Sequence, residues 1–263
     1  MLDLRLSIPW YPPGAPCWVD LLVSDVPQAQ RFYSDLFGWT WRRGDAQTGG
    51  YTLACLDGHP VAGISHKPAT AVVASQWTTC LKVVDLAQAG WAVREHGGRV
   101  LGRPAHLGHL GTTQIAQCPA GTYFGLWEPD ELPGCGLVDQ PGTVTWNELM
   151  AHDFEGAARF HSAVFGHHFS EHTDADGPRW ATAHAGDDNP AFGLSQIGWE
   201  WPVDIPPHWV TSFATDHVVP TLATALELGA TLVHGPFDGP YGVGALLRGL
   251  EGEVFGVLVP DLD

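Results

Sequence analysis

The sequence predicts an α+β fold of four βαβββ modules, arranged as two tandem domains. The first observation behind this prediction is that the chain contains the same pattern twice. The stretch Cys17-Trp-Val-Asp-Leu-Leu-Val-Ser-Asp25 returns as Thr145-Trp-Asn-Glu-Leu-Met-Ala-His-Asp153. The next stretch, Arg31-Phe-Tyr-Ser-Asp-Leu-Phe-Gly38, returns as Arg159-Phe-His-Ser-Ala-Val-Phe-Gly166. A repeat at this distance indicates that the two halves are duplicates of one unit.

The second observation is that each half divides again. Short segments with a glycine between apolar residues end all four quarters: Val61-Ala-Gly63-Ile64, Tyr123-Phe-Gly125-Leu126, Ala191-Phe-Gly193-Leu194 and Val254-Phe-Gly256-Val257. A run rich in Pro, Gly and acid, typical of a domain boundary, separates the second quarter from the third. We therefore expect a domain at 1–132 with modules at about 16–67 and 76–130, a linker at 133–142, and a domain at 143–263 with modules at about 143–198 and 207–260.

The first module shows how each element is predicted. Residues 17–23 form an apolar, β-branched run that Ser24 and Asp25 close, as expected of a strand. Apolar side chains then recur at helical spacing from Val26 to Phe37, and Gly38 ends the helix. Alternating patterns broken by glycines predict three further strands, at 39–43, 50–56 and 59–66.

The second and fourth modules repeat this order of elements. The second is expected to contain a strand at 77–84, a helix at 85–96 and strands at 99–103, 111–117 and 121–127. The fourth is expected to contain a strand at 209–215, a helix at 216–228 and strands at 231–234, 241–248 and 252–259.

Charge and composition exclude several classes of function. The 263 residues include 12 Lys and Arg against 29 Asp and Glu, a formal net charge of −17. This excess of acid disfavours nucleic acid and anionic membrane surfaces, which both attract cationic side chains. No apolar run is long enough to span a bilayer, and the first residues lack the pattern of a secretory signal. The five scattered cysteines are expected to be buried thiols of a reducing compartment, so we expect a cytoplasmic protein.

The opening and closing strands of the modules resemble those of a known superfamily. Pro16-Cys17-Trp18-Val19-Asp20-Leu21, followed by Phe32-Tyr33 and Leu36-Phe37-Gly38-Trp39, is similar to the start of a vicinal-oxygen-chelate module. Cys118-Pro-Ala-Gly-Thr-Tyr-Phe-Gly-Leu-Trp-Glu128 is similar to its closing strand, with Cys118 in place of the usual Asp. This superfamily includes glyoxalase I, extradiol dioxygenases and bleomycin-resistance proteins. The resemblance covers residues 16 to 260 and is strongest to tandem, four-module glyoxalase-like members.

The resemblance implies U-shaped cavities formed by paired modules, and a metal held by the first and last strands of a module in members that bind one. The corresponding positions carry no usable side-chain ligand apart from the weak hydroxyl of Thr78: Trp18, Thr78, Trp146 and Val210 on first strands, and Gly63, Gly125, Gly193 and Gly256 on last strands. A catalytic divalent metal takes about three ligands. We therefore expect no metal and no cofactor at this site. His106, His109, His167 and His168 are poorer metal candidates, for which surface or capping roles are favoured.

The loss of these ligands predicts cavities that are deep and aromatic rather than polar. The 12 tryptophans are expected mostly in the core, and some of them in a cavity wall that stacks on a bulky aromatic ligand. The residues expected to contact this ligand are Trp18, Tyr51, Gly63, Thr78, Cys80, Lys82, Gly125, Trp127, Trp146, Gly193 and Gly256. His59, His66, His184, Gln196 and Tyr241 lie near predicted strand ends, and a structural role is favoured for each.

Two carboxylates are the candidates for acid–base chemistry. Asp20 follows Trp18 on the same face of its predicted strand, and Glu148 follows Trp146 in the same way. A carboxylate among tryptophans in a dry cavity should have a raised pKa, as a general acid or base requires. The alternative is that both pair with an Arg or cap a helix. The first half has the more polar face and is the first place to expect chemistry.

These residues predict a metal-independent enzyme of specialised metabolism that acts on a bulky, polyketide-like aromatic substrate. Dehydration, cyclisation or isomerisation by general acid–base catalysis would suit such a cavity. The alternative is a binding protein that sequesters a drug or carries a hydrophobic intermediate without changing it. A metal-dependent dioxygenase or glyoxalase is a third reading, which the ligand positions disfavour. The chain could act as a monomer or as a homodimer.

Overall fold

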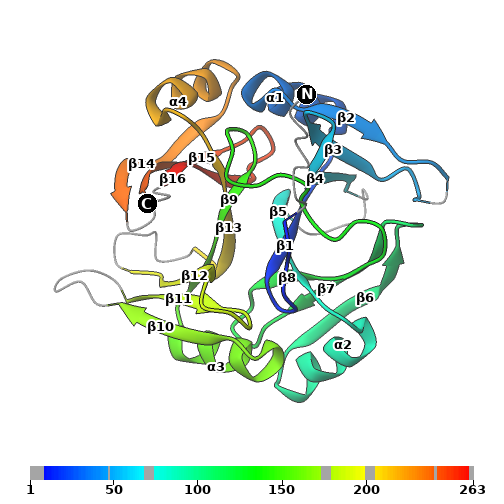
Figure 1. Cartoon of the computed structure of the whole chain (residues 1–263). Coiled ribbons are helices and arrows are strands. Elements are labelled where there is room, and N and C mark those ends of the chain that lie inside the picture. Colours follow the sequence, from blue (N-terminus) through cyan, green and yellow to red (C-terminus); the bar gives the residue numbers. More distant parts are fainter. Residues whose placement is uncertain are drawn as a thin grey trace, which may run out of the picture.

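The computed structural model describes residues 9–46, 48–67, 74–172, 179–198, 205–239 and 242–260, and it has the α+β fold that the sequence predicts. Each half forms one eight-stranded sheet (Figure 1). The first sheet contains β1 (Pro16–Val23), β2 (Thr40–Arg43), β3 (Thr52–Leu56), β4 (His59–His66), β5 (Gln76–Lys82), β6 (Arg99–His106), β7 (Gly111–Gln117) and β8 (Tyr123–Pro129). The second contains β9 (Val144–Ala151), β10 (His168–His172), β11 (Trp180–His184), β12 (Pro190–Gln196), β13 (His208–Ala214), β14 (Thr231–Gly239), β15 (Gly242–Arg248) and β16 (Val254–Pro260).

Both sheets have the same strand order, which is β2-β3-β4-β1-β5-β8-β7-β6 in the first and β10-β11-β12-β9-β13-β16-β15-β14 in the second. Within each module the first strand pairs in parallel with the last, as β1 does with β4. The two modules of a half join where their first strands pair antiparallel, β1 with β5 and β9 with β13. A helix follows each first strand: α1 (Val26–Phe37), α2 (Leu86–Glu95), α3 (Phe154–Phe165) and α4 (Val218–Glu227).

Local sequence explains where the first helix begins and ends. The Asp25 carboxylate accepts a hydrogen bond from the backbone N–H of Gln28 and so caps one of the free donors of the first turn. Gly38 ends the helix with a φ of 74°, in the left-handed region that glycine enters without a steric penalty. Asp153 and Gly166 repeat both features in α3.

Two strands are longer than expected. The predictions at 99–103 and 231–234 are too short, because β6 continues to His106 and β14 continues to Gly239. Both segments contain glycine and proline, and the pairing of each strand with its neighbour shifts register there and then resumes. Bulges of this kind absorb residues that do not fit a regular ladder.

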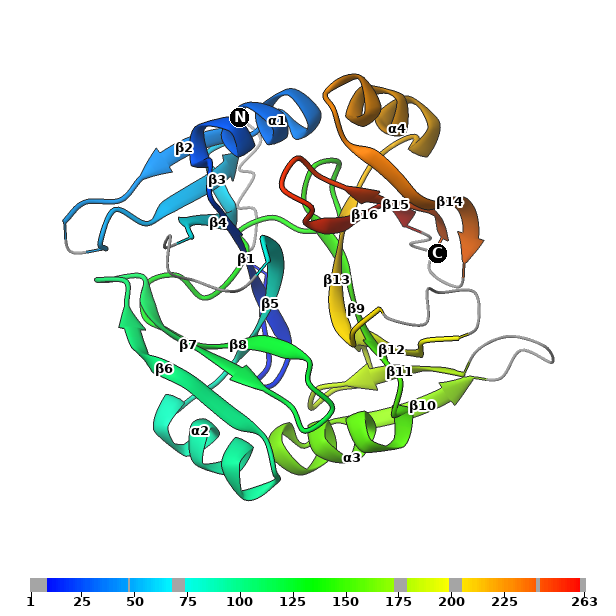
Figure 2. The same ribbon diagram turned by 180° about the vertical axis from the view of Figure 1, so that it is seen from behind.

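The convex faces of the two sheets pack against each other. The helices lie on this same side of the sheets, as one pair at each end of the interface. Figures 1 and 2 show α1 beside α4 at one end and α2 beside α3 at the other, and both pairs are in contact. Each pair covers a hydrophobic cluster that draws residues from both halves of the chain. At the centre, the Asn147 side-chain carbonyl accepts hydrogen bonds from the hydroxyls of Thr79 at 2.9 Å and Thr211 at 3.1 Å. The halves therefore share their cores.

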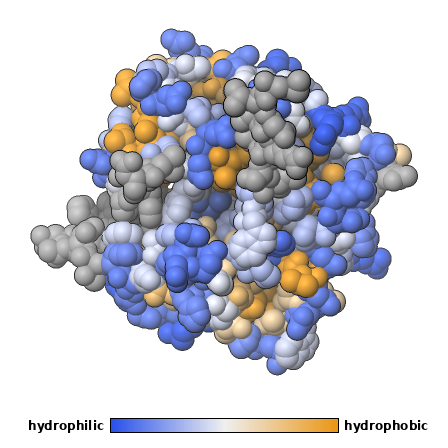
Figure 3. Space-filling model, in the orientation of Figure 1, coloured by the Kyte–Doolittle hydropathy of each residue, from blue (hydrophilic) through white to orange (hydrophobic). Residues whose placement is uncertain are grey.

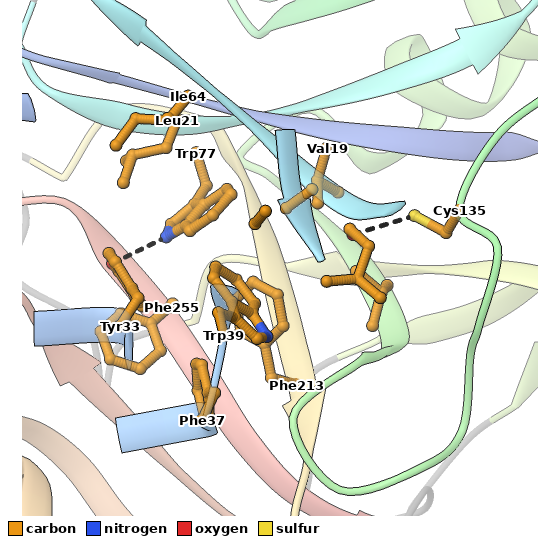
Figure 4. Packing of buried hydrophobic residues seen from close by; sticks show 14 of the residues in the cluster. Val19, Leu21, Tyr33, Phe37, Trp39, Ile64, Trp77, Cys135, Phe213 and Phe255 are labelled. Carbon is orange, nitrogen blue, oxygen red and sulfur yellow. Dashed lines mark hydrogen bonds between the residues drawn. The ribbon is translucent and has the colours of Figure 1, made fainter. Parts of the chain in front are cut away.

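The cluster beneath α1 and α4 is aromatic and its polar groups are paired. Figure 4 shows Tyr33, Phe37 and Trp39 of the first module together with Phe213 and Phe255 of the fourth. The Tyr33 hydroxyl donates to Glu253 at 3.1 Å, and it accepts a hydrogen bond from the Trp77 indole at 3.0 Å.

In the cluster beneath α2 and α3, His161 stands where Tyr33 stands in the first. His161 is fully buried, and neither of its ring nitrogens has a hydrogen-bond partner among the described residues. The Trp209 indole N–H, equivalent to that of Trp77, also lacks a partner within the described ranges. Burial, with a smaller contribution from His167, holds the pKa of the His161 imidazole well below its ordinary value.

The segment that joins the halves has neither helix nor strand between β8 and β9, yet it packs tightly. Cys135 is buried, and its backbone N–H donates to the carbonyl of Cys17 at 2.8 Å. Gly136 donates likewise to the carbonyl of Pro60 at 2.6 Å. Leu132 and Leu137 add to the same hydrophobic cluster. This segment therefore packs against the first residues of β1 and β4 in the N-terminal half.

The remaining surface is polar where it can be seen. In Figure 3 hydrophilic residues dominate the face, and hydrophobic residues form small, separate patches. None of the helices in the described part of the chain has the length and apolar character needed to cross a membrane. All five cysteines are buried free thiols.

Candidate functional site

The four closing-strand glycines each lie opposite a side chain of a first strand. The pairs are Asp20 with Gly63, Cys80 with Gly125, Glu148 with Gly193, and Ser212 with Gly256. In every pair, a Cβ on the glycine would collide with the side chain opposite. The glycines thus make room for these four side chains. Each of these side chains comes two residues after a metal-ligand position that the resemblance indicated, and lies on the same face of the strand. Those positions are Trp18, Thr78, Trp146 and Val210.

In the N-terminal half, Asp20 belongs to a closed hydrogen-bond network. The Tyr51 hydroxyl donates a short hydrogen bond to the Asp20 carboxylate and accepts one from the Trp18 indole at 2.8 Å. Burial raises the pKa of Asp20 to about 6, although the bonds from Tyr51 and Trp18 oppose that rise. Burial also raises the pKa of Tyr51, with a further contribution from Asp20, so this phenol stays protonated.

Most of the other side chains expected to bind ligand in this half are hidden. The exposed fraction is 1% for Trp18, 1% for Cys80 and 0% for Trp127, so these side chains present no surface to a ligand in this conformation. The Trp127 indole donates to the carbonyl of Leu132 at 3.0 Å. Thr78 is also buried. Lys82 is partly exposed and donates to the carbonyl of Tyr11 at 2.8 Å.

Two pockets meet at Tyr51 instead. One, of about 560 Å³, is lined by Arg42, His59 and His109 among others, and the second, of about 910 Å³, by Trp41, His66 and His106 among others. Both are therefore more polar than the aromatic cavity that the sequence suggested.

In the C-terminal half, Glu148 has a different environment. Its carboxylate accepts hydrogen bonds from the Trp146 indole at 2.7 Å and from the Ser195 hydroxyl at 2.6 Å. Glu148, Trp146 and Ser195 are all partly exposed. Burial raises the pKa of Glu148 to about 7 despite these two donors, so its proton is exchangeable near neutral pH.

The face around Glu148 has an apolar side and a polar side. The apolar side is a small cluster of Met150, Ile197, Val210 and Leu246. The polar side, on β10 and β11, carries Ser170, His172, Thr182 and His184. Of these, only His184 was considered from the sequence. Ser195 could have been found two residues after Gly193, on the strand next to that of Glu148. Thr182 could have been found on the strand next to that of Gly193.

The described residues do not fit the metal site of metal-binding vicinal-oxygen-chelate proteins. Gly63, Gly125, Gly193 and Gly256 contribute no side-chain ligand, and each half offers a single carboxylate at the centre of its concave face. Within the described ranges, no three His, Cys, Asp or Glu side chains lie close enough together to share an ion. A divalent catalytic metal takes about three such ligands.

The remaining histidine candidates lie elsewhere. The His106 ring contacts the Thr112 hydroxyl at 2.9 Å on an exposed strand end. His167 is buried against the carbonyl of Gly14 at 3.0 Å, and His168 is exposed on β10. Tyr241, like residues 1–8 and 261–263 of the expected domains, lies outside the described residues.

Curated relatives match the chain over almost its whole length. The "Putative glyoxylase CFP32" of Mycobacterium tuberculosis is 33% identical over 258 residues, which is 95% of this chain and 96% of the relative. The "Anthracycline biosynthesis protein DnrV" of Streptomyces peucetius is 31% identical over 262 residues and 94% of each chain. The chain belongs to the vicinal-oxygen-chelate superfamily. No model of a known protein family matches it.

Solved structures of vicinal-oxygen-chelate enzymes share the fold. The 2,3-dioxygenase LapB from Pseudomonas sp. KL28 matches with a TM-score of 0.65 at 15% identity, over 94% of this chain and 93% of LapB. The Mn(II)-bound glyoxalase from Novosphingobium aromaticivorans matches with a TM-score of 0.63 at 15% identity, over 95% of this chain and 83% of the glyoxalase. At this identity the likeness shows the fold alone.

Proposed function

We propose that this protein is a metal-independent enzyme of specialised metabolism that acts on a bulky, oxygenated polycyclic substrate by general acid–base catalysis. The reaction would be a dehydration, cyclisation or isomerisation, since each of these needs proton transfer and no redox partner. The relationship to DnrV, an anthracycline biosynthesis protein, supports this class of substrate.

The observation that carries the proposal is the pair of equivalent carboxylates, each beside a glycine on the concave face of its sheet. A carboxyl group that titrates near neutral pH can both accept and release a proton during turnover. The pKa values of Asp20 and Glu148, about 6 and about 7, suit this role.

Of the two, Glu148 is the better placed to act on a substrate. It is partly exposed, and the Trp146 ring beside it has exposed surface as well. Asp20 is partly exposed too, but its carboxylate is bonded to the hydroxyl of Tyr51, the residue that lines both N-terminal pockets. We therefore assign proton transfer to Glu148 and give Asp20 the smaller role.

The test is turnover by metal-free protein. Protein purified without chelators is expected to contain less than about a tenth of an equivalent of iron, zinc, nickel or manganese per chain, below the one ion that a catalytic site requires. It is then incubated with a panel of hydroxylated anthraquinones and anthracyclinones, with and without added chelator. Mass spectrometry should detect an isomer or the loss of one water, equally in both samples. Near-stoichiometric metal, or turnover abolished by chelator, would overturn the proposal.

A second candidate is a binding protein that holds the same ligand unchanged. The Trp18–Tyr51–Asp20 network favours it, because these polar groups are already hydrogen-bonded to one another. Tight binding with complete recovery of the unaltered ligand after long incubation would favour this function over catalysis.

A further inference from the structure

The concave face of the C-terminal half places a row of polar side chains beside Glu148. Strand register sets Ser170 next to Thr182, Thr182 next to Gly193, and Gly193 next to Glu148. The intervening residues on β11, Ala181 and Ala183, are fully buried in the core on the other face. The even-numbered side chains of β11 therefore share one face with Glu148.

These side chains contact one another in a connected polar ladder, defined here as Ser170, His172, Thr182 and His184, in which Thr182 is 8% exposed and the other three are more exposed. The Thr182 hydroxyl lies 3.2 Å from Nε2 of His172 and 3.4 Å from Nε2 of His184. The Ser170 hydroxyl lies 3.3 Å from the same His184 nitrogen. The Nδ1 atom of His184 is buried and has no partner within the described part of the chain. Hydroxyls and neutral imidazoles both donate and accept, so the ladder can bind either a carbonyl or a hydroxyl oxygen.

The ladder offers no fixed positive charge. It contains no Lys or Arg, and the nearby Arg179 is bonded to Glu155 at 2.9 Å and Glu171 at 2.8 Å. A site for carboxylate or phosphate would use an unengaged guanidinium or ammonium group. The ladder therefore suits neutral oxygens.

The N-terminal half lacks this feature at equivalent positions. There, register sets Arg42 next to Leu53 and Leu53 next to Gly63, so an apolar side chain stands where Thr182 stands. Leu53 is buried. The ladder is thus a property of the C-terminal half and not of the repeated module.

We infer that the polar ladder is the subsite for the hydroxyl and carbonyl oxygens along one edge of a neutral polycyclic aromatic ligand. The hydrocarbon edge of that ligand lies on the apolar cluster of Met150, Ile197, Val210 and Leu246, through the partly exposed side chains packed against it, Ile205, Val233 and Phe237. Glu148 stands between the two sides, which places a proton-transfer group at the oxygenated rings. This inference rests on the proposed function in taking the same concave face as the site.

Binding of two matched probes tests the inference. Quinizarin is an anthraquinone with one hydroxyl beside a carbonyl on each long edge, and unsubstituted anthraquinone has the same rings and carbonyls without the hydroxyls. Wild-type protein should bind quinizarin about tenfold more tightly, the equivalent of one or two net hydrogen bonds. Thr182→Val keeps the shape and strand preference of the residue but loses the hydroxyl, and it should reduce this ratio to about threefold or less. Thr182→Ser retains the hydroxyl and should preserve the ratio.

The matched control is Thr113→Val, the same exchange on β7 of the N-terminal half, which should leave the ratio unchanged. Melting curves of each variant check the fold. An unchanged ratio in Thr182→Val overturns the inference, as does wild-type protein that fails to bind quinizarin or to prefer it. Failure of the proposed function is a separate result, because quinizarin discrimination through Thr182 can hold in a protein that converts no substrate.

Discussion

The two concave faces carry a carboxylate at the same strand position, but the chain surrounds Asp20 and Glu148 differently. Asp20 is bonded to the buried Tyr51, and the Trp18 side chain that completes this network is 1% exposed. Glu148 is bonded to Ser195, and its neighbour Trp146 keeps exposed surface. The joining segment bonds to Cys17 and Pro60 in the N-terminal half and, through Gly142, to Ala214 in the C-terminal half. A repeated scaffold thus preserves the position of a carboxylate, while its hydrogen-bond partners differ between the halves.

Replacing each carboxyl by its amide gives the largest expected difference between the halves. Glu148→Gln should lower kcat/KM by about a hundredfold or more, the usual size of a lost general base. Asp20→Asn should lower it by less than about tenfold. Steady-state kinetics on a substrate found in the panel measures both. Equal losses, or a larger loss for Asp20→Asn, would reverse the assignment.

The pH dependence of turnover distinguishes the carboxylates without mutation. If ionised Glu148 accepts the proton, kcat/KM should fall about tenfold per pH unit below its pKa of about 7 and level off above it. Action by Asp20 would move this transition to about pH 6. The profile is measured from pH 5 to 9 with buffers of constant ionic strength. A profile without a transition in this range contradicts both assignments.

Removing one hydroxyl from each network compares their contributions to stability. Tyr51→Phe leaves the buried Trp18 N–H and the Asp20 carboxylate without their shared partner, so unfolding free energy should fall by about 1–3 kcal/mol. Ser195→Ala removes one of two bonds to a partly exposed Glu148 and should cost less than about 1 kcal/mol. Denaturant unfolding gives both values. A greater loss for Ser195→Ala would show that the C-terminal network is the more rigidly closed.

The clusters beneath the two helix pairs also differ, and the effects on stability expected there are smaller. His161 is neutral in the folded protein, whereas the unfolded chain binds a proton below about pH 6.5, so His161 lowers stability as pH falls through that value. His161→Phe should remove this part of the acid sensitivity and leave stability at pH 8 within about 1 kcal/mol of wild type.

Tyr33→Phe is the control for that prediction. It breaks the bonds to Glu253 and Trp77 in the equivalent interface, and it should lower stability by about 1 kcal/mol at neutral pH while keeping the acid sensitivity. Thermal melting between pH 5 and 8 measures both variants. The same decline with acid in His161→Phe as in wild type would contradict the role given to His161.

The repeat, the helix boundaries and the order of elements within modules could be predicted because they depend on local patterns. Asp25, Gly38 and the apolar, β-branched run at 17–23 act over a few residues, and their effects are visible in the chain itself. The environment of Asp20 could not be predicted in this way. It depends on Tyr51, which is distant in sequence, and on a joining segment whose Pro and Gly content suggests a loose linker while Cys135 is in fact buried.

The aromatic wall is the clearest example of this limit. Trp18 and Trp146 occupy the same position of the repeat and are indistinguishable by pattern. The Trp18 N–H bonds to the hydroxyl of Tyr51, which directly precedes β3, whereas the Trp146 N–H bonds to Glu148 on its own strand. Such a difference comes from tertiary partners, which periodicity does not reveal.

The shared cores have a consequence for how such a protein can change. Two separate copies of one half, packed through the same convex faces, would be encoded by one gene, and every mutation would appear in both sites at once. In a single chain that joins the halves, each site has its own codons while the common interior holds them together. Tyr51 can then bond to the carboxylate of one concave face while Ser195 bonds to that of the other. Joining the halves in one chain thus allows one site to change while the other half maintains the shared core.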